Sequence, residues 1–282
     1  MDPVRAIYLA ALCLILLGAV LTWQSGEVQS GLFLISAIMA AGAYSLAPQL
    51  RWWHWKRNPP DLPTDMAPLL ERFPLYRALD LEGKRDFRRR AFLIREATEY
   101  TGMAIENIPA DVRLMAAASA ATITFYREEF LIPEFENVIF YPHQFPTPQH
   151  DVLHASEMYA EDGVIIWTLK YFIRSVIEPD KYLQLGFYEY ARALFATDPE
   201  ARDRAARHAL TFPEIHQLTD FSREALQTFI GLQDLDLSAL TLTVFHSHAP
   251  GFAARYPERF TGLIADFPLR LPAHPAGEAP SA

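Results

Sequence analysis

AIYLAALCLILLGAVLTW, residues 6–23, decides the architecture, because it contains no charged residue and is almost entirely apolar. After a polar stretch at residues 24–30, a second apolar run covers residues 31–48. A helix rises about 1.5 Å per residue, so each run is just long enough to cross a hydrocarbon core of roughly 30 Å. We therefore expect a transmembrane helical hairpin over residues 1–50. A cleaved signal peptide is the alternative for the first run, but residues 22–24 make a poor cleavage site.

The charges around the hairpin indicate its orientation. Arg5 precedes the first run, the connecting loop holds Glu27 and no Lys or Arg, and Arg51, Lys56 and Arg57 follow the second run. By the positive-inside rule, both termini and the soluble domain should lie in the cytoplasm. Four tryptophans fall at the expected boundaries, where indole rings favour the headgroup zone, namely Trp23, Trp52, Trp53 and Trp55.

Composition excludes several classes of function. The chain has 282 residues, with 34 Asp+Glu against 25 Lys+Arg, and the basic residues form only short runs. A nucleic acid is therefore not expected as a partner. The single cysteine, Cys13, allows no intrachain disulfide and no cysteine-rich zinc site.

The rest of the chain predicts a helix-dominated α+β domain with a small sheet. A proline-rich segment at 58–63 indicates a stiff juxtamembrane linker, which we place at residues 51–65. The domain follows at 66–270, and a Pro/Ala-rich tail at 271–282 is expected to be disordered. Apolar β-branched runs predict strands at 137–141 and 163–169. Helical spacing predicts helices at residues 69–76, 84–101, 112–122 with Asp111 as N-cap, 181–196, 199–210, 221–230, 237–246 and 257–267.

Several short motifs occur in an order that is similar to a known family. They are FPLYRAL at 73–79, an Ala-rich helix leading into Thr124 and Phe125, IFYP at 139–142, GVIIW at 163–167 and FAARYPERF at 252–260. Together they resemble the M90 zinc peptidases, the Mlc titration factor family. The resemblance implies a zincin-like fold with aminopeptidase-like activity. It also implies an H-E-x-x-H helix whose histidines bind zinc, with a later acidic residue as third ligand.

The sequence departs from the family where that chemistry would lie. The segment in register is YEYAR at 188–192, which keeps the glutamate, Glu189, but has Tyr188 and Arg192 in the histidine positions. Asp236 falls at the third-ligand position. A guanidinium has no lone pair for a metal, and a neutral tyrosine is a poor zinc ligand. We therefore expect no catalytic residue and no bound cofactor, and we hypothesise that Arg192 bridges Glu189 and Asp236 in place of the metal.

Other histidines offer an alternative metal site. His150, His154 and Glu157 could share one face of a helix, and zinc is expected only under this alternative. The segment lies between two predicted strands and follows several prolines, so a loop or hairpin is the stronger interpretation. His246 and His248 are two apart and would not share a helix face.

These observations predict a membrane-anchored M90-like pseudopeptidase of a bacterial inner (plasma) membrane, with two spans, that acts as a protein-binding, regulatory or scaffolding module. A cleft for an extended peptide can bind one without a metal. One alternative is a zinc-dependent metallopeptidase with relocated ligands. Another is an accessory subunit of an inner-membrane complex, with small residues of the spans packed against other helices. The basic run at 84–90 is interpreted as a solvated helix face, or else as a membrane-surface contact.

Overall fold

The computed structural model describes residues 3–63 and 66–268. The chain divides into two compact units, Met1–Asp61 and Leu62–Ala282. The predicted disordered tail at 271–282 lies outside the described residues.

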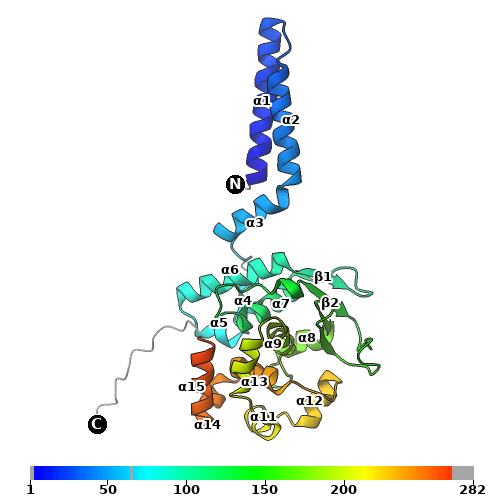
Figure 1. The fold of residues 1–282 in the computed structure, drawn as a ribbon, viewed down its shortest axis with the longest axis vertical. Coiled ribbons are helices and arrows are strands. Elements are labelled where there is room, and N and C mark those ends of the chain that lie inside the picture. Colours follow the sequence, from blue (N-terminus) through cyan, green and yellow to red (C-terminus); the bar gives the residue numbers. More distant parts are fainter. Residues whose placement is uncertain (1–2, 64–65, 269–282) are drawn as a thin grey trace, which may run out of the picture. The chain divides into compact units, whose positions relative to one another are not determined.

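The first unit is a helical hairpin followed by a third helix. Helices α1 (Pro3–Ser25) and α2 (Ser30–Ser45) pack along each other (Figure 1). The ring of Phe33 lies so near Gly18 that an added Cβ would meet it at 3.3 Å. Helix α3 (Ala47–Arg57) occupies residues 51–57, which we had assigned to the linker. The three indoles and the apolar first turn of α3 allow this helix to continue up to the prolines at 59 and 60.

Only one described helix is by itself long and apolar enough to cross a membrane, and it is α1. Helices α2 and α3 pass the same test only as a pair, with a bend of 68° between them. The first unit therefore contains one clear candidate span, or two if the bent pair is one span. The two-span hairpin and its cytoplasmic orientation stay predictions.

The second unit is helix-dominated and carries one four-stranded sheet, as the fold class predicted. The strand order is β1-β2-β4-β3, with β1 (Glu99–Gly102) parallel to β2 (Asn137–Tyr141), β2 parallel to β4 (Val164–Thr168) and β3 (Ser156–Tyr159) antiparallel to β4. The helices are α4 (Ala67–Leu70), α5 (Pro74–Ala78), α6 (Leu81–Ala97), α7 (Ala110–Ile123), α8 (Leu169–Ile177), α9 (Leu185–Thr197), α10 (Pro199–Ala206), α11 (Phe212–Thr219), α12 (Arg223–Ile230), α13 (Leu237–Ser247), α14 (Ala249–Arg255) and α15 (Pro257–Asp266).

The sheet is larger than the two strands that we predicted. Strands β2 and β4 confirm the apolar β-branched runs. Residues 99–101, which the sequence pattern places at the end of a helix, form β1 with Gly102 instead, because their backbone pairs with β2. Strand β3 was also missed, since its side chains are almost all buried and show no alternation.

Helix α7 lies at the centre of the second unit, where it packs against α6 and α9 (Figure 1). Eleven of its residues are buried, and five of these are alanine, which lets neighbouring helices approach closely. One close approach is at Gly186 of α9, where an added Cβ would collide with Ser119 Oγ. The prediction of Asp111 as the N-cap of α7 is wrong. The helix begins at Ala110, so Asp111 lies inside its first turn.

The basic run on α6 is not simply a solvated face. Arg90 is 3% exposed, and its Nη1 donates to the carbonyl oxygens of Phe125 at 3.0 Å and Arg127 at 2.7 Å. Its Nε also donates to Asp86 at 2.8 Å. The guanidinium thus satisfies carbonyl groups just beyond the end of α7, which would otherwise have no helical partner. Sequence periodicity could not distinguish this residue from its exposed neighbours.

Candidate functional site

The degenerate motif lies on α9, the most enclosed helix of the second unit apart from α7. Helix α9 packs against α7, α13, α10, α8 and β3. Ten of its residues are buried, among them Tyr188 and Glu189. The Glu189 side chain has 0% exposure. A charged carboxylate in such a place is costly unless it has ionic and hydrogen-bonding partners.

Both oxygens of Glu189 have such a partner. Arg192 Nη1 donates to Oε2 at 2.7 Å, and Ser156 Oγ of β3 donates to Oε1 at 2.5 Å. Arg192 lies one helical turn after Glu189, so the two side chains share a face of α9. Its side chain is 22% exposed, so the ion pair has one buried end and one end near solvent. Ser156 had no signal in the sequence, because it comes from a strand that the pattern did not reveal.

The ion pair also controls the protonation of its basic member. Burial by itself lowers the pKa of Arg192, but the charge and hydrogen bond of Glu189, together with the effects of Tyr188 and Asp236, offset burial and raise the pKa above its ordinary value. The guanidinium therefore stays charged. Burial raises the pKa of Tyr188 well above its ordinary value. Tyr188 is consequently a neutral phenol, and its ring lies 5.6 Å from the Arg192 guanidinium carbon.

Asp236, the predicted third-ligand position, is also nearby, but its carboxylate has other partners than our hypothesis gives it. The Asp236 backbone N–H donates to the Tyr188 hydroxyl at 3.0 Å, so these two positions are in direct contact. The Asp236 carboxylate caps α13 by accepting from the backbone N–H groups of Ser238 and Ala239. Its Oδ2 pairs with Arg202 Nη2 at 3.2 Å. Arg192 therefore pairs with Glu189 but not with Asp236, because capping and Arg202 already hold the Asp236 carboxylate.

These residues do not fit a zinc ion. The Arg192 guanidinium is bonded to the glutamate, the Tyr188 oxygen accepts a backbone N–H, and the Asp236 carboxylate is directed to a helix end. The guanidinium has no lone pair to offer a metal, and the Tyr188 oxygen and the Asp236 carboxylate are already engaged in hydrogen bonds within the fold. Across residues 3–63 and 66–268, no group of three or more His, Cys, Asp or Glu side chains is placed to hold a metal ion.

The alternative metal residues do approach one another, as two pairs that share a carboxylate. His154 Nε2 lies 3.0 Å from Glu157 Oε2, and His150 Nε2 lies 3.5 Å from Oε1. His154 Nδ1 lies 2.8 Å from the Val152 carbonyl oxygen, to which it donates. Burial by itself raises the pKa of Glu157. Hydrogen bonds, of which the one from His154 has the largest effect, outweigh burial and lower the pKa below its ordinary value. The predicted loop or hairpin is present as well, because Phe145 and His154 form an antiparallel bridge.

His246 and His248 lie at the end of α13, and they differ in burial. His246 is 4% exposed, and burial lowers its pKa to about 3, so the ring is neutral. It contacts the rings of Phe187 and Phe245. His248 follows the helix, and its Nδ1 lies 2.8 Å from Ser247 Oγ.

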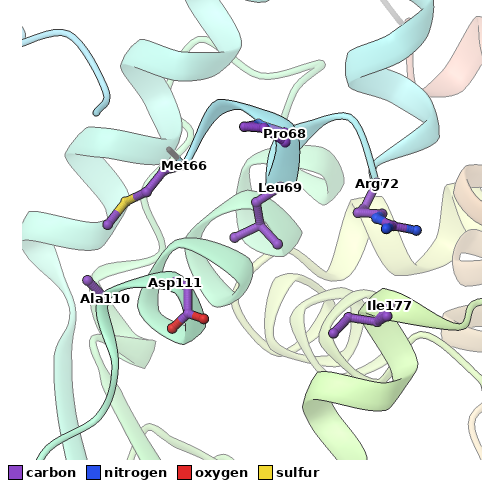
Figure 2. Close-up of a pocket in the computed structure, with 7 residues that line it drawn as sticks. All are labelled: Met66, Pro68, Leu69, Arg72, Ala110, Asp111 and Ile177. Carbon is purple, nitrogen blue, oxygen red and sulfur yellow. The ribbon is translucent and has the colours of Figure 1, made fainter. Parts of the chain in front are cut away.

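Two surface pockets lie away from this motif. One of about 580 Å³ has Arg72 and Asp111 among the side chains on its wall (Figure 2). A larger pocket of about 720 Å³ is lined by apolar side chains of α5, α13 and α15 and by His246. Tyr188, Glu189 and Arg192 line neither pocket.

The second unit is therefore a helix-dominated α+β domain with a buried glutamate on a central helix, paired with Arg192 one turn later. Residues 50–166 match the family described as glucose-regulated metallo-peptidase M90. This match confirms the resemblance drawn from the sequence over the residues that it covers. The matched range ends before α9, so it includes neither the YEYAR segment nor Asp236. No curated protein and no solved structure matches the chain.

Proposed function

We propose that this protein is a membrane-anchored M90-like pseudopeptidase with a zincin-like fold, and that it serves as a protein-binding, regulatory or scaffolding module at a bacterial inner membrane. The observation that carries the proposal is the Arg192–Glu189 ion pair at 2.7 Å. It puts a permanent cation in the place where the family has a metal ligand.

The surroundings of Glu189 argue against its use as a general base. A general base must reach the proton that it removes, directly or through one water. The Glu189 carboxylate has 0% exposure, and each oxygen already accepts a hydrogen bond from Arg192 or Ser156. Substrate and water cannot contact it in this arrangement. Retaining the glutamate therefore supports the fold rather than hydrolysis.

A binding role is supported by the edge of the sheet. Strand β1 pairs with β2 on one side, and its Glu99 and Thr101 are exposed. No described strand pairs with the other side of β1. An extended segment of a partner protein can add to such an edge through backbone hydrogen bonds alone. This mode of binding requires neither metal nor catalytic residues.

Peptide hydrolysis by the purified full chain tests the proposal. The chain is incubated with aminopeptidase substrates, with and without added zinc, beside a Glu189→Gln variant. We expect no cleavage above that of the variant under either condition. Cleavage that needs zinc and is lost in Glu189→Gln would overturn the pseudopeptidase proposal.

The partner is sought separately, by crosslinking in membranes that contain the full chain. A photoreactive residue at Thr101, on the exposed edge of β1, is compared with one at Lys181, an exposed residue after α8. We expect one discrete protein adduct from position 101 and none from position 181. Equal labelling from both positions would contradict binding at this edge.

A further inference from the structure

Helix α3 has a composition unlike that of any other helix in the described chain. Its sequence, APQLRWWHWKR, contains no acidic residue, and its last seven residues include three tryptophans and three strong bases. Every tryptophan stands four residues from a base, in the pairs Arg51 with Trp55, Trp52 with Lys56, and Trp53 with Arg57. Residues four apart are neighbours on a helix, so indole and cation lie together all round α3.

The structure shows two of these pairs in contact. The Arg57 guanidinium carbon lies 3.9 Å from the Trp53 ring centroid, and Lys56 Nζ lies 5.3 Å from that of Trp52. The Trp53 ring is nevertheless 55% exposed. Exposed indoles favour neither bulk water nor hydrocarbon, whereas cations are costly in hydrocarbon. The headgroup layer of a membrane satisfies both kinds of side chain at once.

The geometry of the hairpin brings α3 to that layer. Helix α2 has 16 residues, so it is about 24 Å long, which falls short of a hydrocarbon core of roughly 30 Å. The chain then bends by 68° before α3 begins. The first turn of α3, from Ala47 to Leu50, follows the bend and is uncharged, so it can lie at the edge of the hydrocarbon core. The bend keeps residues 51–57 from running straight away from the membrane.

We infer that α3 lies in the headgroup layer and binds anionic phospholipids. The inference rests on the membrane anchoring in the proposed function. A negatively charged leaflet complements a segment with three strong bases and no acid, and each such base near the surface strengthens attraction by about fivefold. The hairpin alone would hold the chain in any bilayer, whereas α3 selects its lipid neighbours.

The test uses the full chain with a fluorescent label at a single cysteine, His54→Cys, in a Cys13→Ser background. The protein is reconstituted into phosphatidylcholine vesicles with or without phosphatidylglycerol. We expect headgroup-level nitroxide lipids to quench the label and aqueous iodide to leave it largely unquenched. A label at Arg85→Cys, an exposed site on α6, provides the reference for iodide.

Lipid preference is measured by energy transfer from the label to acceptor-labelled phosphatidylglycerol or phosphatidylcholine at equal mole fractions. Transfer to phosphatidylglycerol should be several-fold greater, and high salt should reduce the excess. The excess should disappear in Arg51→Glu/Lys56→Glu/Arg57→Glu. It should persist in the matched control Arg85→Glu/Lys181→Glu/Arg223→Glu, which changes the charge equally at exposed sites of the second unit.

Two failures are distinguishable. Equal transfer to both lipids in intact, membrane-bound protein, or iodide quenching at position 54 as strong as at position 85, would overturn the lipid inference alone. Release of the intact chain from vesicles by alkaline carbonate would overturn the anchoring itself, and the inference with it.

Discussion

Replacing Arg192 with methionine removes the only described cation that pairs with Glu189 and keeps a side chain of similar length. The glutamate would then lie at 0% exposure without its cation, with Ser156 as its remaining hydrogen-bond donor. Breaking a buried ion pair by removing one partner costs about 3–5 kcal/mol. The Arg192 side chain is 22% exposed, so water can partly replace it, and we expect a loss of about 3 kcal/mol.

The assay is thermal unfolding of the full chain in a mild detergent, followed by circular dichroism. For a domain of this size, 1 kcal/mol shifts Tm by about 2–4 °C, so Arg192→Met should lower it by about 6–12 °C. Glu189→Gln/Arg192→Met should recover more than half of this shift, because no uncompensated charge remains. A loss below about 1 kcal/mol in Arg192→Met, or no recovery in the double variant, would refute the buried-pair interpretation.

Three further predictions follow from buried groups. Burial lowers the pKa of His246 to about 3, so below about pH 6.5 the unfolded chain binds a proton that the folded chain does not. The stability that neutral His246 contributes is therefore complete above about pH 6.5 and is lost as the pH falls toward about 3. Between about pH 7.5 and 5 the wild-type protein should lose about 2 kcal/mol of stability through His246, and His246→Phe should abolish this loss, as measured by urea unfolding. An unchanged pH dependence in the variant would contradict the prediction. Gly186→Ala should cost about 1–3 kcal/mol because its Cβ would collide with Ser119, whereas Ser119→Gly should rescue it in the same assay. Arg90→Met should cost about 2–5 kcal/mol of stability because the carbonyl groups beyond α7 lose their donor, and Arg90→Lys should recover only part of this loss. A loss under about 1 kcal/mol in Arg90→Met would exclude a stabilising role for these hydrogen bonds.

Much of the fold could be predicted from local patterns. Apolar β-branched runs located β2 and β4, and helical spacing located the helices that now appear as α10, α12, α13 and α15 within a few residues. The errors have physical causes. Pro74 and the turn before it divide the predicted helix at 69–76 into α4 and α5. Strand β1 exists because of its pairing with β2, which is a tertiary contact without a strong local signal.

Some contacts of the site could likewise be predicted from the sequence, and others could not. The motif on α9 and the Arg192–Glu189 pair were predictable, because the two residues are three apart on one helix. Ser156 and Arg202 were not, since each comes from a distant segment that only the fold brings near. Asp236 was assigned to Arg192 by position, but its carboxylate first satisfies the N–H groups at the start of α13.

Metal content tests the central claim most directly. The full chain is purified without chelators, and its zinc is measured by mass spectrometry beside a His150→Ala/His154→Ala variant. The ion pair at Glu189 predicts far less than one equivalent of zinc in both proteins. About one equivalent in the wild-type chain would contradict the claim, and its loss in the histidine variant would assign the metal to His150 and His154 and restore the metallopeptidase alternative.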